Sequence, residues 1–284
     1  MSDSTRLTWR ALHAEAAERL GSKEEARRLV ERASGLEGSE YVLGLDQRAS
    51  ARAEPFFRAM LERRAAGEPL QYVIGQWGFR RLDLYVDRRV LIPRPETEMV
   101  VQVALGELPR LGAAPVIVDL GTGSGAIALS LAVEVPSASV WATDRSAEAL
   151  VVARANLAGI GRDAARVRVQ EGSWFGALPD DLQGGVQLVI SNPPYIADAE
   201  ELPPVVEEWE PAGALRAGPT GLEDVATIVA EAPVWLAHPG ALVVEIAPHQ
   251  ADQAMALART AGLHDIEVRL DLAGRRRVLV ARQG

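Results

Sequence analysis

The chain has 284 residues, of which 48% are hydrophobic, and it carries a net charge of −9. It is long enough for one large or two modest domains, and its composition is that of an ordinary soluble globular protein. Cysteine is absent and the four histidines form no HxxxH pair, which excludes disulfides and thiolate metal sites and leads us to predict no metal centre.

The first twenty residues, MSDSTRLTWRALHAEAAERL, do not have the pattern of a signal peptide. They lack the basic start and the apolar core of a signal peptide, and no apolar run in the sequence reaches the length of a membrane span. We therefore expect a cytoplasmic protein with no membrane association.

Helical patterns follow in the first part of the chain. Apolar residues recur every four positions from Leu12 to Leu20. SKEE then has the form of a capping box, with Ser22 as the N-cap of a second helix and Glu25 reaching back to the Ser22 backbone N–H. A third helical pattern occupies SARAEPFFRAMLERRAAGEP. Residues 1–75 are therefore predicted to form a small helical domain.

The next segment, LQYVIGQWGFRRLDLYVDRRVLI, has a different character. It is rich in β-branched and aromatic residues, and Gly75 and Gly78 interrupt the apolar runs. This pattern is typical of short strands or a hairpin. We expect residues 76–92 to form a β connector between two domains. A helix should begin near Pro95, because proline is favoured in the first helical turn and acidic residues follow it.

Strands and helices are predicted to alternate through residues 93–284. The strand candidates are Val116–Leu120, Ser139–Thr143, Val167–Gln170, Val186–Ile190, Ala241–Ala247, Ile266–Leu270 and Arg277–Ala281. Helix-compatible stretches between the earlier strands are typical of a doubly wound parallel sheet. Only DLAGR joins the last two strands, so the sheet should finish with an antiparallel strand. We predict an α/β fold with a Rossmann-like, mostly parallel seven-stranded sheet.

A glycine-rich loop follows the first of these strands, in VIVDLGTGSGAIALSLA. Gly121, Gly123 and Gly125 permit a sharp turn that brings main-chain N–H groups close to a ligand. The spacing is neither the GxGxxG of dinucleotide-binding folds nor that of a P-loop, and the loop has no lysine for a triphosphate. Asp144 comes nineteen residues after Gly125, at the end of the next strand, where a carboxylate can bind both hydroxyls of a ribose.

These features predict a nucleoside cofactor without a pyrophosphate, and S-adenosylmethionine fits that description. Asp119 is expected near the cationic end of the cofactor, and Trp174 is expected either to flank the adenine or to pack in the core. Gly121, Gly123, Gly125 and Asp144 are the residues that these patterns assign to the cofactor.

The loop after the fourth strand reads SNPPY, and ligands of open parallel sheets lie at this end of the strands. A planar NH₂ group conjugated with a carbonyl or a ring is a weak nucleophile, because its lone pair is delocalised. Asn192 Oδ1 and the Pro193 carbonyl can accept its two N–H groups and stabilise the charge that develops during methyl transfer. Pro193 and Pro194 remove competing N–H donors, and Tyr195 offers a flat surface for the planar group. We predict that Asn192, Pro193 and Tyr195 are catalytic and that all four residues from Asn192 to Tyr195 bind the substrate.

The two motifs together resemble those of amino-methyltransferases that use S-adenosylmethionine. Nearly the whole chain resembles one branch of them, the bacterial peptide-chain-release-factor N5-glutamine methyltransferases (the PrmC/HemK family). The resemblance is carried by GEPLQYVIGQWGF, VLIPRPETEMVV, VDLGTGSGAIALSLA, SNPPYI, EPAGALRAGPTGLE, VEIAPHQ and DLAGRRRV. It implies a class I methyltransferase domain that methylates the side-chain amide of the glutamine in the GGQ motif of class 1 release factors. It further implies that S-adenosylmethionine is bound by Gly121, Thr122, Gly123, Ser124, Gly125, Asp144, Trp174 and Asn192. It also implies that the helical domain helps to dock the release factor, and we expect a monomer.

Two other functions are compatible with these residues. An adenine N6-methyltransferase acting on DNA or RNA meets the same chemical problem, but residues 91–284 carry 14 basic and 25 acidic side chains. That charge repels nucleic acid, so we expect no stable nucleic-acid binding. A non-catalytic binding protein for translation factors could also retain this fold. The role of Arg94–Pro95–Glu96 is open between a brace at the start of a helix and a substrate contact.

Overall fold

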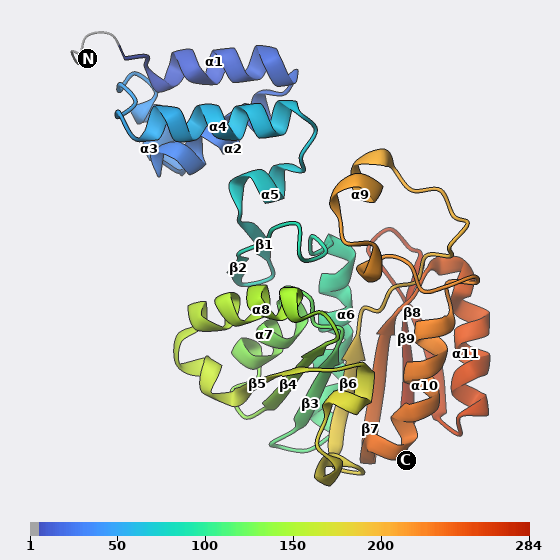
Figure 1. Ribbon diagram of the computed structural model, residues 1–284. Helices are drawn as coiled ribbons and strands as arrows, with labels where there is room; N and C mark the ends of the chain where they lie inside the picture. The colour runs from blue at the N-terminus through green and yellow to red at the C-terminus, as the bar shows by residue number, and fades with distance from the viewer. Residues whose placement is uncertain (1–5) are drawn as a thin grey trace. The chain divides into compact units, whose positions relative to one another are not determined.

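The computed structural model describes residues 6–284, which form two compact units: one ends at Gln76 and the other spans Trp77–Gly284 (Figure 1). Each unit has a hydrophobic core of its own, made only of residues from that unit. Each therefore has the packing expected of an independent domain.

The first unit is helical. Its helices are α1 (Trp9–Leu20), α2 (Lys23–Ser34), α3 (Gly38–Gly44), α4 (Ala53–Ala65) and α5 (Leu70–Ile74). Leu12, Leu29 and Phe57, from α1, α2 and α4, are fully buried in one cluster. The apolar residues whose spacing predicted these helices therefore face the core of the unit.

One half of the predicted capping box forms at the start of α2. Ser22 Oγ accepts a hydrogen bond from the Glu25 N–H at 3.2 Å. The Glu25 carboxylate instead pairs with Arg64 of α4, at 2.7 Å between Oε2 and Nε. The reciprocal half of the prediction is wrong, because an ion pair between two helices engages the glutamate.

A short helix, α5, replaces part of the strand structure that the sequence predicted before Gly75. α5 ends at Gly75, which has a left-handed φ of 65°. Arg63 of α4 donates to the carbonyl oxygens of Tyr72 (3.0 Å) and Val73 (3.3 Å). The guanidinium satisfies carbonyl groups that a helix end leaves unpaired, so a tertiary contact overrides the β-branched composition of the segment.

The second unit begins with a hairpin and continues into the main sheet. The hairpin pairs β1 (Trp77–Phe79) with β2 (Leu82–Leu84) in antiparallel register. The strands of the main sheet are β3 (Val116–Leu120), β4 (Ser139–Asp144), β5 (Val167–Glu171), β6 (Val186–Ser191), β7 (Leu236–Glu245), β8 (His264–Leu270) and β9 (Arg276–Gln283). Their order is β5-β4-β3-β6-β7-β9-β8, with β3 to β7 parallel and β9 antiparallel to both of its neighbours. The predicted Rossmann-like sheet with an antiparallel last strand is confirmed.

Helices cover both faces of this sheet (Figure 1). One layer contains α6 (Pro95–Glu107), α7 (Ala126–Glu134) and α8 (Ala147–Gly159). The opposite layer contains α10 (Glu223–Trp235) and α11 (Ala251–Thr260), which pack together over β7, β8 and β9. A short α9 (Pro204–Trp209) lies between β6 and α10 in the chain. Short 3₁₀ turns occupy Leu108–Arg110, Gly161–Arg166, Trp174–Ala177, Asp180–Leu182, Ala212–Ala214 and Pro248–Gln250. Within residues 6–284, no helix is both long and apolar enough to cross a bilayer.

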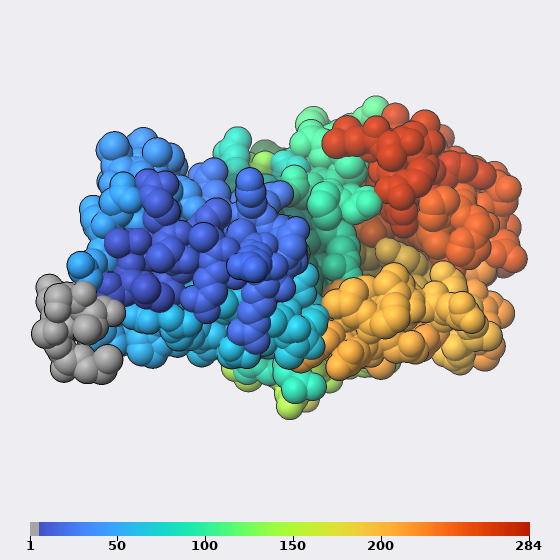
Figure 2. Space-filling view, turned by 90° about the horizontal axis from the view of Figure 1, so that it is seen from above, coloured from blue at the N-terminus to red at the C-terminus, as the bar shows by residue number. Residues whose placement is uncertain are grey.

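The carboxyl ends of the parallel strands meet at one edge of the sheet. Leu120 of β3 is in register with Thr143 of β4 and with Ser191 of β6. The glycine loop and the SNPPY loop therefore begin side by side. Residues 197–209, gold in Figure 2, form exposed surface of the second unit beyond the SNPPY loop.

Candidate active site

A cavity of about 290 Å³ lies at this edge of the sheet. It is lined by the glycine loop, the end of β4, the turn after β5 and the SNPPY loop. The predicted site residues on its wall are Gly121, Thr122, Gly123, Ser124, Asp144, Trp174, Asn192 and Pro194. The fold therefore brings together residues that the sequence separates by more than seventy positions.

The glycine loop is held open by backbone contacts to β4. The N–H groups of Gly121 and Thr122 both donate to the Thr143 carbonyl oxygen, at 2.9 and 2.8 Å. Gly121 has a φ of 73°, and a Cβ added there would lie 3.3 Å from the Trp174 ring. Glycine is required at this position because the backbone is left-handed and an aromatic ring covers it.

Asp144 and Trp174 complete this part of the cavity wall. Asp144 Oδ2 accepts a hydrogen bond from the Gly123 N–H and Oδ1 accepts one from the Ser146 N–H, each at 2.9 Å. Trp174 lies at the start of a 3₁₀ turn, with a φ of 45°, and packs against the core while one part of it faces the cavity. The two roles that the sequence left open for Trp174 are thus compatible with each other.

Asp119, predicted near the cationic end of the cofactor, is buried behind the glycine loop and does not line the cavity. Its side chain is completely buried, and Oδ2 accepts hydrogen bonds from Thr122 Oγ1 (2.6 Å) and from the Ala128 N–H (3.1 Å). Burial raises the pKa of Asp119 to about 7. Asp119 therefore links the glycine loop to the start of α7 by hydrogen bonds, and it does not line the cavity.

The Asn192 side chain of the SNPPY loop lines the cavity and is held there by a hydrogen bond to α6. Asn192 Nδ2 donates to Thr97 Oγ1 at 3.0 Å, and the Thr97 hydroxyl donates to Glu245 Oε2 at 2.8 Å. Asn192, Thr97 and Pro194 line the cavity, whereas Pro193 is buried and Tyr195 lies behind the wall. The bond to Thr97 is made by the nitrogen of the Asn192 amide, so the amide oxygen, Oδ1, takes no part in it.

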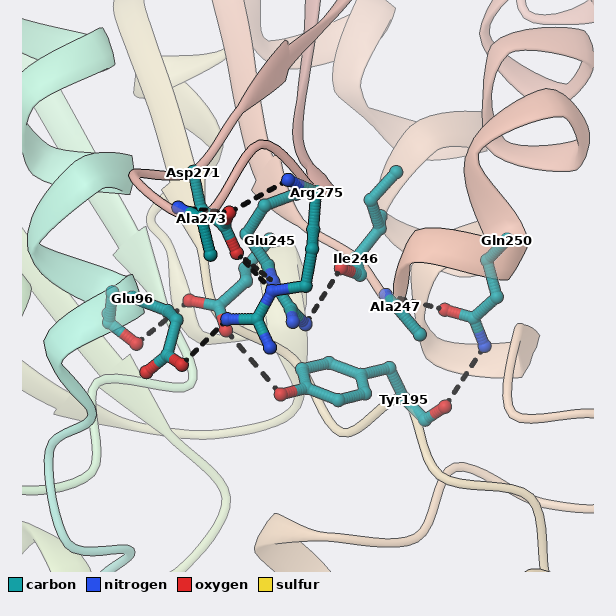
Figure 3. A network of polar contacts seen from close by, with 11 residues as sticks. Glu96, Tyr195, Glu245, Ile246, Ala247, Gln250, Asp271, Ala273 and Arg275 are labelled. Atoms are coloured by element: carbon teal, nitrogen blue, oxygen red, sulfur yellow. Dashed lines mark hydrogen bonds and ion pairs between the residues drawn. The ribbon is translucent and has the colours of Figure 1, made fainter.

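Tyr195 and its loop are fixed from the other side by β7 and the turn that follows it (Figure 3). The Tyr195 hydroxyl points toward Glu245 Oε1, at 3.5 Å, which is at the limit of a hydrogen bond. Gln250 Nε2 donates to the carbonyl oxygens of Tyr195 and Gly221, both at 2.9 Å, while its Oε1 accepts from the Ala247 N–H. Burial raises the pKa of Tyr195 to about 12 and the pKa of Glu245 to about 7.

Arg94, Pro95 and Glu96 connect α6 to two other segments of the second unit. Pro95 is the first residue of α6, and the Arg94 guanidinium pairs with the buried carboxylate of Glu210. Glu96 pairs with Arg275, in the turn between β8 and β9, at 2.9 Å. These contacts support a bracing role for the stretch.

Sequence reasoning missed Thr97 and Glu245 as parts of the site. Both lay within segments that carried the family resemblance, but neither was assigned a role. Glu245 is a carboxylate in the otherwise apolar run ALVVEIA, at the carboxyl end of a parallel strand. A charged residue at that place in a buried strand is the signal that could have identified it. Within residues 6–284, no cluster of three or more acidic or histidine side chains is placed to hold a metal ion.

The fold is one that known methyltransferases share, and comparisons with known proteins support that class. The family model described as "Methyltransferase small domain" matches residues 100–211. A methyltransferase structure from Pyrococcus furiosus superposes with a TM-score of 0.52, at 18% identity over 72% of this chain and 89% of that one. The catalytic domain of human Mettl16, solved with an RNA hairpin, gives a TM-score of 0.55 at 15% identity, covering 79% of this chain and 81% of that one. At such identities these two structures show a shared fold alone.

Sequence similarity identifies the branch of this class. The release factor glutamine methyltransferase of Burkholderia pseudomallei is 41% identical over 88% of each chain. That of Deinococcus radiodurans is 42% identical over 91% of this chain and 90% of its own length. The family model described as "PrmC N-terminal domain" matches residues 10–75. The chain belongs to the release factor glutamine methyltransferase family.

Proposed function

We propose that this protein transfers a methyl group from S-adenosylmethionine to the side-chain amide nitrogen of the glutamine in the GGQ motif of class 1 release factors. The family to which the chain belongs supports the substrate. The observation that carries the chemistry is that Asn192 lines the cavity and is anchored through Nδ2 on Thr97, a bond that does not use its Oδ1 and so keeps that oxygen available as an acceptor.

The residues of the cavity fit S-adenosylmethionine. The Asp144 carboxylate has lone pairs left for ribose hydroxyls after it accepts the two backbone N–H groups. The Trp174 ring offers an apolar surface for adenine, and Gly121 and Gly123 of the glycine loop carry no side chain that would fill the cavity. A cavity of about 290 Å³ is close to the lower end of the usual range for small-molecule sites.

Each predicted catalytic residue has a separate task in this mechanism. The cofactor, when bound, supplies an electrophilic methyl group. Asn192 Oδ1 and the Pro193 carbonyl accept the two N–H groups of the substrate amide and favour the geometry in which its nitrogen lone pair is released. Pro193 and Tyr195 adjoin Asn192 and Pro194 but do not line the cavity, so their contacts with the planar amide are proposed to form when the release factor binds. The diproline keeps backbone donors away from these oxygens. No general base needs to act early, because the nitrogen becomes acidic once it carries the methyl group.

The helical unit is proposed to help dock the release factor, which requires recognition beyond the glutamine itself. Its match to the "PrmC N-terminal domain" model supports this role. We also propose that the protein acts as a cytoplasmic monomer without stable nucleic-acid binding, since its second unit is strongly acidic.

Methyl transfer from labelled cofactor tests the proposal. We expect purified protein to label a class 1 release factor and to leave unlabelled a variant with GGA in place of GGQ. Asn192→Ala should reduce kcat by about 10²–10³, the usual cost of losing one transition-state hydrogen bond. Label that persists in the GGA variant, or that enters DNA or RNA instead, would contradict the proposal.

A further inference from the structure

Three polar side chains from distant parts of the chain, Asn192, Thr97 and Glu245, form a continuous hydrogen-bonded relay that runs from the cavity wall into the core. Asn192 bonds to Thr97, and Thr97 bonds to Glu245, at 3.0 and 2.8 Å. Thr97 is 4% exposed and Glu245 is 1% exposed, so water does not compete for these bonds. Only the Asn192 and Thr97 members of the relay reach the cavity.

The direction of each bond in this relay depends on whether Glu245 carries a proton. An ionised carboxylate can only accept, so the single Thr97 hydroxyl proton must point to Glu245. Thr97 can then only accept from Asn192, which must present Nδ2 to Thr97 and Oδ1 to the cavity. A protonated Glu245 can donate to Thr97 instead. The Thr97 proton is then free to bond Asn192 Oδ1, which turns the Nδ2 donor toward the cavity.

Several charged and titratable groups face Glu245 from the elements packed around it. Glu96 of α6 opposes its ionisation, whereas Arg277 of β9 favours it. Tyr195 approaches it from the SNPPY loop, and Arg94 acts on Tyr195 in turn. Burial outweighs the favourable contacts, because the pKa of Glu245 is raised to about 7. Both forms of the relay are therefore populated near neutral pH.

We infer that Glu245, acting through Thr97, is a positioning residue whose ionisation sets the orientation of the Asn192 amide and thereby switches the site to its competent form. Glu245 does not touch the reacting atoms. The inference deepens the proposed function and rests on it for the catalytic consequence, but the orientation itself can be measured without any substrate.

The sequence allows an unusually direct measurement, because Asn156 and Asn192 are its only asparagines. Protein labelled with ¹⁵N in asparagine side chains should give two NH₂ signals by NMR. Asn156 is an internal reference, since it bonds only backbone groups: its Nδ2 donates to the Tyr85 and Ser124 carbonyl oxygens and its Oδ1 accepts from the Tyr85 N–H. Asn192→Asp removes one signal and assigns the pair.

We expect the Asn192 signal of the native protein to shift with pH with a midpoint of about 7, while the Asn156 signal stays constant. In Glu245→Gln this titration should disappear, because the glutamine amide cannot ionise and keeps nearly the same shape. Asp119 also titrates in this range, but it is unchanged in the variant, so the difference between the two proteins isolates Glu245. An Asn192 signal that does not move with pH, or that moves equally in Glu245→Gln, overturns the inference.

Kinetics with a release factor test the catalytic consequence. We expect kcat of the native protein to decrease as the pH falls below about 7, and Glu245→Gln to lose that acid limb, with little change in KM for the cofactor. Thr97→Val should lower kcat by about tenfold because it removes the link between Glu245 and Asn192, and Thr97→Ser should recover most of that loss because the hydroxyl is restored. Thr260→Val, which removes an exposed hydroxyl of α11, is the matched control and should retain native activity.

Two results separate a positioning role from a structural one. If Glu245→Gln keeps the native acid limb of kcat, the inference is overturned. If the native protein fails to methylate release factors, the proposed function fails, whereas the NMR titration of Asn192 still decides the orientation of the amide.

Discussion

Asp144 has both carboxylate oxygens bonded to backbone N–H groups of neighbouring turns. It therefore organises the glycine loop as well as offering lone pairs to a ribose. An asparagine at this position keeps the shape, but it presents an NH₂ group to one of the two backbone donors and removes the charge.

We predict that Asp144→Asn weakens binding of S-adenosylhomocysteine by about tenfold to a hundredfold, as expected for losing a charged hydrogen bond. Isothermal titration calorimetry measures this directly. Asp180→Asn, at an exposed acid in a 3₁₀ turn, is the control and should bind normally. Equal affinities of native protein and Asp144→Asn would show that this carboxylate does not contact the ligand.

Glu245 and Asp119 give the protein a pH-dependent stability with a defined sign. Burial raises the pKa of each folded-state carboxyl to about 7, above the ordinary values of 4.5 and 3.8. Their contribution to the free energy of unfolding is complete below those ordinary values and is lost as the pH rises through about 7.

We predict that Glu245→Gln gains thermal stability relative to the native protein as the pH rises from about 5 to about 8, because the variant never buries a charge at that position. Tm measured by calorimetry at several pH values provides the comparison. A difference in Tm that stays constant over this range would mean that Glu245 does not titrate in the folded protein.

At the scale of elements, the alternation of apolar strand-like segments with helix-compatible segments was enough to predict the sheet. All seven strands form, and the DLAGR turn joins β8 to β9 as expected. The misassigned elements depend on tertiary contacts. α5 is held by Arg63, and the α2 capping box loses Glu25 to Arg64. Local sequence patterns do not encode such partners.

The same reason explains which parts of the candidate site were predicted. Glycines, Asp144 and SNPPY are recognisable because each is a local motif at the end of a strand. Thr97 and Glu245 are 148 residues apart, and Thr97 is 95 residues from Asn192. Their relation exists only after α6 has packed beside β6 and β7, so spacing along the chain could not reveal it.

The close contact between Gly221 and the SNPPY loop gives a prediction at the scale of elements. Gly221 has a φ of 76°, and a Cβ there would lie 2.6 Å from the Tyr195 carbonyl oxygen and 2.9 Å from the Ala197 nitrogen. We expect Gly221→Ala to lower the free energy of unfolding by about 1–3 kcal/mol and to reduce kcat, because the loop must shift. Chemical denaturation and the methylation assay measure the two effects.

Gly159→Ala is the matched control for that substitution. Gly159 ends α8, and a Cβ there meets no atom within 4 Å. Its stability should be unchanged or slightly higher, since alanine is the better helix former. Equal behaviour of the two alanine variants would contradict a close contact between Gly221 and the loop.

At the scale of the whole molecule, the two units have separate hydrophobic cores. One core belongs to the helical unit, and the other joins the sheet to α10 and α11. The cavity and the relay use only residues after Trp77, so cofactor binding should not need the helical unit.

We predict that a fragment of residues 77–284 folds and binds S-adenosylhomocysteine with native affinity, but methylates an intact release factor at least about tenfold less efficiently, through a higher KM. Calorimetry and steady-state kinetics test the two halves of this prediction. A fragment with native kcat/KM would show that the helical unit does not dock the substrate.

The central claim is that Asn192 Oδ1 holds the nitrogen that receives the methyl group. A crystal structure with S-adenosylhomocysteine and a GGQ-containing release factor tests it most directly. We predict Asn192 Oδ1 within about 3.2 Å of the glutamine side-chain nitrogen, with Nδ2 still bonded to Thr97. An Asn192 side chain turned away from the glutamine, or presenting Nδ2 to it, would contradict the claim.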